Sequence, residues 1–150
     1  MIRANRMQAL ASIGQLQRTL EHLAYVPRRA AVIAAPKLTA LIRKQFREGR
    51  DPYGRAWADL KPSTLQKHGP PPLTDSGQLR DGTEAVAMRA NYAGIRLTLG
   101  ARYGYFHQVG FRVGHIRVPA RRIFPQHGLP APWRQVLVAA CKQAAREAKR

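Results

Sequence analysis

Apolar residues near the amino terminus recur at steps of three and four positions. The residues that follow this spacing are Leu10, Ile13, Leu16, Leu20 and Leu23. Such a pattern places its members on one stripe of an amphipathic helix. The polar face carries Gln15, Arg18 and His22, so we expect the stripe to cover the protein core and not a membrane surface.

A second apolar stripe follows two prolines. Pro27 suits a helix start, and Pro36 is expected to kink or restart the helix, because proline lacks an amide hydrogen and clashes with the preceding turn. Gly49 is placed as a helix C-cap. The apolar residues between Pro36 and Gly49 again keep helical spacing: Leu38, Leu41, Ile42 and Phe46. The pattern therefore predicts two amino-terminal helices.

Residues 49–82 are predicted to form a long loop. Residues 51–54 are typical of a turn, Ser63 is predicted to cap a short helix, and the three prolines at 70–72 favour an extended segment. Trp57 and Leu60 are apolar anchors within this stretch. We expect a loop with such anchors either to fold back onto the core or to dock on a partner.

A small antiparallel sheet is predicted after the loop. Residues 83–88 and 95–99 alternate between small or apolar and polar side chains, and residues 90–94 can turn the chain between them. Residues 115–118 form a further short extended segment. We expect this segment to add a third strand to the sheet.

A carboxyl-terminal helix is predicted to begin at Pro132. Its expected inward-facing residues are Trp133, Val136, Leu137, Ala140, Cys141 and Ala144. The complete prediction for residues 1–150 is one α+β domain. It consists of amino-terminal helices, a long loop, a small antiparallel β-sheet and a carboxyl-terminal helix.

Charge is the unusual property of this chain. Its 26 lysines and arginines outnumber its 8 acids, giving a formal net charge of +18. Such a protein attracts polyanions or acidic protein surfaces. One interpretation is therefore a small basic protein that binds nucleic acid through the phosphate backbone. The candidates for contact with DNA or an acidic surface lie in the carboxyl-terminal segment: Arg134, Lys142, Arg146, Lys149 and Arg150.

The sequence offers little reactive chemistry. Cys141 is the single cysteine, which excludes an intramolecular disulfide, and we expect it to be a packed structural thiol. The five histidines are dispersed, so no metal site is predicted. Asp75, Asp81 and Glu84 are the only acids near enough to suggest a degenerate nuclease, and turn formation explains the two aspartates better. We predict no enzyme, no cofactor and no membrane span.

Several short motifs occur in order over residues 46–124. The first group comprises Phe46, Asp51-Pro52-Tyr53-Gly54-Arg55-Ala56-Trp57, Leu60-Lys61-Pro62-Ser63-Thr64, Leu73, Ser76-Gly77 and Leu79-Arg80. The second comprises Tyr103, His107-Gln108-Val109-Gly110 and Val118-Pro119-Ala120-Arg121-Arg122-Ile123-Phe124. Together they resemble the phage virion morphogenesis family, the tail-completion proteins of P2-like and Mu-like contractile-tailed phages. One departure is an extra residue before Phe124, where the family has Pro-Ala-Arg-Pro-Phe.

The resemblance implies a structural virion protein that acts in tail completion, as a tail terminator, or in head–tail joining. Copies would form a homo-oligomer, a hexameric ring at the tail end or neck. The implied partners are tail tube or sheath proteins and head connector proteins, with contact to the packaged DNA as a further expectation. The protein would reside in the virion, and in the host cytoplasm during assembly.

The motifs also supply candidates for contact with partners. The loop at residues 49–82 is the expected interlocking contact between subunits. Arg121 is expected to reach a carboxylate, because its planar guanidinium favours bidentate pairing. His107 and Gln108 are expected to tie a loop to a strand by side-chain hydrogen bonds. The full set of candidate interface residues is Trp57, Leu60, Tyr105, His107, Arg121 and Phe124.

Overall fold

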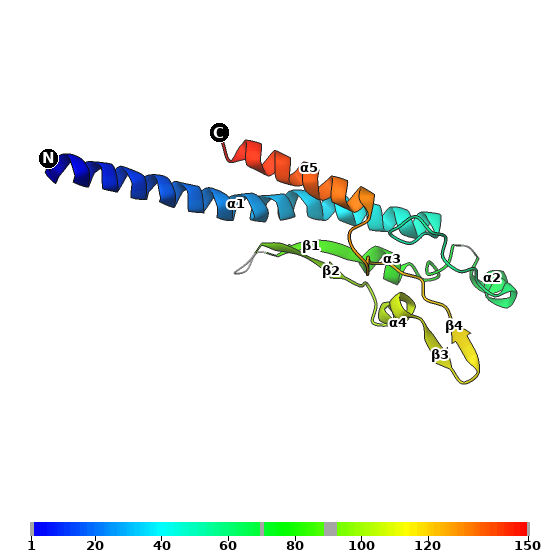
Figure 1. Ribbon diagram of the computed structural model, residues 1–150. Helices are drawn as coiled ribbons and strands as arrows, with labels where there is room; N and C mark the ends of the chain where they lie inside the picture. The colour runs from blue at the N-terminus through cyan, green and yellow to red at the C-terminus, as the bar shows by residue number, and fades with distance from the viewer. Residues whose placement is uncertain (1, 70, 89–92, 150) are drawn as a thin grey trace.

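The fold is built along one long helix, α1 (Ile2–Glu48). A computed structural model describes residues 2–69, 71–88 and 93–149 and shows an α+β protein. Helix α5 (Ala131–Glu147) packs along one side of α1, and a hairpin of β1 (Glu84–Met88) and β2 (Gly94–Thr98) packs along another side (Figure 1). The carboxyl-terminal helix is therefore confirmed.

The predicted division into two amino-terminal helices is wrong. Helix α1 continues through both Pro27 and Pro36 (Figure 1). Both prolines are exposed, so a backbone carbonyl that loses its partner there can bond to water. Packing of α1 on α5 and β1 offsets the local cost. The helix ends at Glu48, and Gly49 follows with a φ of 62°, as expected for a C-cap.

The predicted β-hairpin is confirmed. Strands β1 and β2 are antiparallel, with Ala85 opposite Leu97. The predicted turn at residues 90–94 lies largely outside the described residues. Thr39 joins α1 to this sheet, because its hydroxyl accepts a 3.0 Å hydrogen bond from the amide of Ala85.

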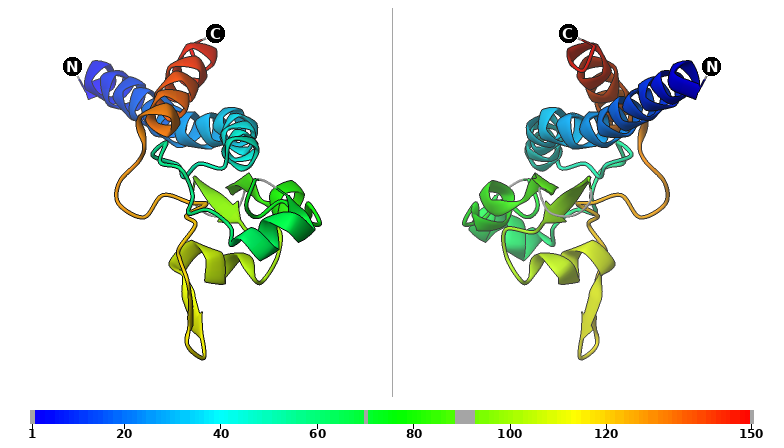
Figure 2. Two further views of the ribbon diagram at one scale, coloured as in Figure 1. Left: turned by 90° about the vertical axis from the view of Figure 1, so that its right-hand side faces the viewer. Right: turned by 90° about the vertical axis from the view of Figure 1, so that its left-hand side faces the viewer.

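The predicted third strand of this sheet is wrong. Strand β4 (Ile116–Val118) pairs with β3 (Phe111–Val113) in a separate antiparallel hairpin. Helix α4 (Gly104–Val109) lies between β2 and β3 and redirects the chain. The second hairpin therefore projects from the body of the protein (Figure 2).

The core lies where α1 meets the first hairpin, α5 and the loops. Its largest fully buried side chains are Phe46, Ile42, Leu79 and Ile123. A second cluster consists of small residues between α1 and α5: Ala30, Ala34, Ala140 and Ala144. Cys141, predicted to be packed, is exposed, because this interface is formed by its neighbour Ala140 instead.

Two short helices occupy the long loop. They are α2 (Pro62–His68) and α3 (Gln78–Gly82). Helix α2 confirms the predicted short helix but not its cap, because Lys61 holds the N-cap position and Ser63 lies inside the helix. Helix α3 brings the chain to β1, where the buried hydroxyl of Thr83 donates to the carbonyl of Leu79 and accepts from the amide of Gly100.

Candidate functional site

Most of the motif residues meet at one place, which we call the motif junction: the end of α1, residues 51–61, α4 and residues 119–124. Trp57 shows how it is built. Its ring packs edge-on against Phe46 with 5.4 Å between centroids, and its Nε1 donates a 2.9 Å hydrogen bond to the carbonyl of Arg122. Trp57 is buried. It therefore folds back onto the core, and its predicted role in contacting a partner is wrong.

Arg121 ties the same loop to the segment after β4. Its Nε donates to the carbonyl of Ala58 at 2.9 Å, and its Nη2 donates to the carbonyl of Asp59 at 3.0 Å. The predicted pairing with a carboxylate is therefore wrong, because the planar guanidinium binds two backbone oxygens instead. Burial lowers the pKa of Arg121, and the Asp59 carboxylate acts in the opposite direction.

Gln108 is the third anchor of the motif junction. Its Oε1 accepts hydrogen bonds from the amides of Ile123 and Phe124, at 2.7 and 2.9 Å, and its Nε2 donates to the carbonyl of Phe124 at 2.9 Å. The side chain thus ties α4 to the last part of the motif block. In that part, where Arg122 and Ile123 place one extra residue before Phe124, Ile123 is fully buried in the core, and Phe124 is partly buried and packs against the same core.

His107 lies between the motif junction and a cleft of about 240 Å³. The cleft is also lined by Leu60, Arg121, His68 and Asp75. His68 Nδ1 lies 2.8 Å from Asp75 Oδ1. Burial, and after it the charge of Arg121, lowers the pKa of His107. The cleft is therefore lined by a neutral imidazole at pH 7 and contains apolar as well as polar side chains.

The depressed pKa of His107 predicts a dependence of stability on pH. The unfolded chain takes up a proton at this histidine near pH 6.5, whereas the folded protein does so only at lower pH. The free energy of unfolding should therefore be intact above pH 6.5 and fall as the pH drops through the folded pKa. Titration of the ring by NMR measures this pKa, and His107→Gln should flatten the pH dependence. A midpoint at or above 6.5 would contradict the prediction.

The three acids considered for a degenerate nuclease lie apart from one another in their contacts. Asp81 is held by Arg80, whose Nε and Nη2 lie 2.7 and 2.9 Å from its carboxylate oxygens, and this contact lowers the pKa of Asp81. Asp75 faces His68 instead, and Glu84 begins β1. Across residues 2–69, 71–88 and 93–149, no three potential metal-ligating side chains converge.

No protein-family model, curated protein or solved structure matches this chain. None of the helices within the described ranges is both long and apolar enough to cross a bilayer.

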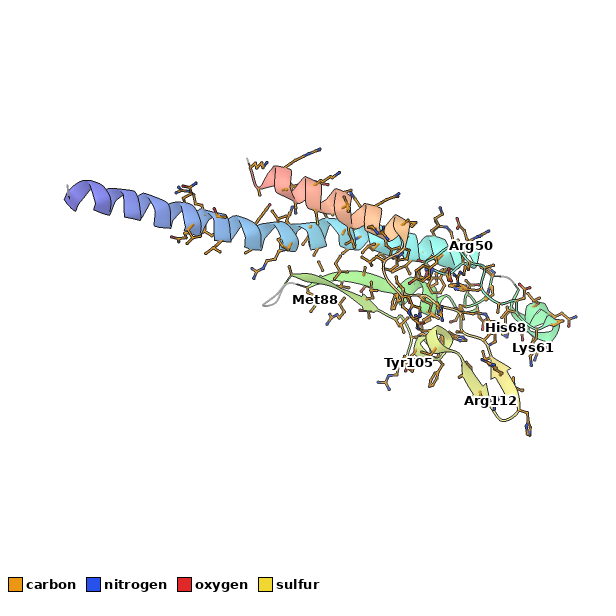
Figure 3. All side chains as sticks on the ribbon, in the orientation of Figure 1. Arg50, Lys61, His68, Met88, Tyr105 and Arg112 are labelled. Carbon is orange, nitrogen blue, oxygen red and sulfur yellow. The ribbon has the colours of Figure 1, made fainter. Side chains whose placement is uncertain are left out.

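Most of the remaining candidate residues that the structure describes are exposed. Tyr105 is 61% exposed on α4, and Leu60 is partly buried at the cleft. Figure 3 shows Tyr105 on the side of α4 away from α1. The basic candidates along α5 and just after it are all exposed: Arg134, Lys142, Arg146 and Lys149. Arg150 lies outside the described residues.

The apolar face of the second hairpin was missed by the sequence-based prediction. The second hairpin exposes Val113 and Ile116, which are 60% and 51% exposed. They are cross-strand partners, as are Arg112 and Arg117, so the hairpin has one apolar and one basic face. The alternation of these residues on either side of Gly114 was a usable signal for a hairpin.

Proposed function

We propose that this protein is a structural component of a tailed-bacteriophage virion, acting in tail completion or head–tail joining as a ring of identical copies. The proposal starts from the resemblance over residues 46–124 to the phage virion morphogenesis family. Its partners would be tail tube or sheath proteins and the head connector.

The observation that carries the proposal is the use of the motif side chains. Trp57, Gln108 and Arg121 all bond to backbone groups of distant segments. These hydrogen bonds hold the loop, α4 and residues 119–124 in fixed positions, and they use polar atoms of the three motif side chains. This use of motif residues supports a protein that works by fitting against its neighbours.

The exposed apolar surface gives further support. Side chains such as Leu16, Tyr105 and Val113 are each at least 60% exposed. Leu16 lies on α1, whereas Tyr105 and Val113 lie on α4 and β3, and exposed apolar surface is one mark of a protein-contact site. A subunit that assembles with identical copies requires such surface.

Imaging of phage tails tests the proposal. We expect a phage that lacks this gene to produce tails of abnormal length, or tails that do not join heads, in negative-stain images. Mass spectrometry should detect the protein in purified wild-type virions, and supply of the gene in trans should restore normal particles. Normal virions that lack the protein would refute the proposal.

That negative outcome would favour a second candidate, a small protein that binds nucleic acid by its phosphates. The supporting observation is the exposed basic surface of α5 and its end, formed by Arg134, Lys142, Arg146 and Lys149. Helical spacing places the three that lie within α5 on one side of that helix. Such a surface contacts the DNA backbone without reading its sequence.

A further inference from the structure

The amino-terminal part of α1 carries apolar residues that α5 does not reach. Arg29 pairs with Glu147 at the last residue of α5, so the cover provided by α5 ends at this level. Helix α1 extends beyond Val26 for about 36 Å, at 1.5 Å per residue. Figure 1 shows this part of α1 reaching past every other element.

The uncovered surface of α1 continues the buried one. Leu16 lies about five helical turns before Ala34, and therefore on the same side of the helix. Ala34 is fully buried against α5, whereas Leu16 and Leu20 are 60% and 57% exposed. We name these two leucines the helix stripe. It is the extension of an established helix interface past the end of its partner.

A second apolar surface lies at the other end of the protein, on α4 and the projecting hairpin. Phe106 and Phe111 pack against each other with 5.8 Å between ring centroids. Val113 and Ile116 extend this surface along the hairpin, on the face that holds Phe111. We name these four residues the hairpin face. A two-stranded hairpin is marginally stable unless its apolar face is covered.

The arginines around the hairpin face disfavour a second positively charged surface as its partner. Residues 102–122 contain five arginines and no acid, and Arg112 and Arg117 lie opposite each other on the hairpin. Two hairpins brought together would repel each other. Residues 14–26 of α1 carry Arg18 and Glu21, whose charges cancel. The helix stripe is thus an apolar surface within a neutral segment of the same chain.

We infer that the helix stripe of one copy docks on the hairpin face of a second copy. This inference rests on the proposed assembly of copies and names the contact between them. One contact covers both exposed surfaces, and it joins two different surfaces, which is the heterologous geometry that a cyclic ring requires. Glu21 enters a region of excess positive charge, which favours this pairing over contact between two hairpins.

Disulfide trapping in the full-length chain tests the contact. Cys141 is exposed, so all variants carry Cys141→Ser. We expect mild oxidation of a mixture of Leu20→Cys and Val113→Cys proteins to give a covalent pair of one chain of each kind, identified by isotope labelling of one chain. Val138→Cys is the control for Val113→Cys, because Val138 is also exposed but lies on α5, and it should not be trapped with Leu20→Cys.

The strength of association provides a second measurement. In sedimentation experiments, Leu20→Lys should weaken self-association by at least about tenfold. Leu20→Glu should weaken it less, because the hairpin face lies among arginines. Val138→Lys should leave association unchanged. Equal losses for Leu20→Lys and Leu20→Glu, or trapping of Leu20→Cys with itself, would overturn the inference in favour of a symmetric helix pair.

Failure of this contact and failure of the proposed function give different results. Protein found in virions, with no trapping between positions 20 and 113 in solution or in particles, would overturn the contact alone. Trapping together with normal virions that lack the protein would overturn the function alone. If copies associate neither in solution nor in particles, both the contact and the proposed ring of copies are overturned.

Discussion

Phe46→Ala should lower the free energy of unfolding by about 3–5 kcal/mol. Phe46 is fully buried at the end of α1, and its replacement leaves a cavity that the surrounding side chains fill only in part. The edge-on contact with Trp57 is lost too, at about 0.5–1.5 kcal/mol within that total. Urea unfolding followed by circular dichroism measures the change.

Phe106→Ala is the matched control for this experiment. Phe106 is 52% exposed on α4, so its replacement should change the stability of the isolated chain by less than about 1 kcal/mol. Equal effects at the two positions would show that the end of α1 does not form the core described here.

Gln108→Leu should lower the free energy of unfolding by about 2–5 kcal/mol. Leucine has a similar volume but cannot bond to the amides of Ile123 and Phe124 or to the carbonyl of Phe124. Each buried polar group left without a partner costs about 1–3 kcal/mol. Urea unfolding measures this change, and NMR shifts of residues 121–124 should locate it.

Gln135→Leu supplies the comparison, because Gln135 is exposed on α5. Its effect should lie within about 0.5 kcal/mol. A loss of stability as large as that of Gln108→Leu would mean that the substitution of glutamine by leucine, and not the three hydrogen bonds, causes the effect.

Local periodicity was sufficient to predict much of the fold. The stripe before Gly49, the first hairpin and the carboxyl-terminal helix depend on spacing within a short window, and each is present. The continuity of α1 through Pro36 was not predictable in this way. The cost of a proline is local, whereas the packing on α5 and β1 that offsets it comes from residues far away in the sequence.

The candidate site was predictable in part. Of the side-chain hydrogen bonds expected from His107 and Gln108, those of Gln108 are present, and they join α4 to residues 123 and 124 in place of a loop to a strand. The Nδ1 atom of His107 is buried and has no hydrogen-bond partner among the described residues. The backbone partners of Arg121 could not be predicted, because carbonyl oxygens occur at every residue and carry no sequence signal. The strand at 116–118 was assigned to the wrong sheet, because the sequence does not show that α4 turns the chain away first.

Because α1 is one continuous helix, a small rotation of its buried half displaces its amino-terminal end by a larger distance. Its buried half packs through Ala30 and Ala34 against Ala140 and Ala144 of α5. These small side chains let the backbones of α1 and α5 approach closely. A tilt of about 5° at Ala30 would move the amino-terminal end of the helix by about 4 Å, because about 42 Å of helix lies between them. The direction in which the projecting end points is therefore set inside the core. In any closed assembly built through this helix, four small side chains would help to set the angle between neighbours, and so the curvature of the whole.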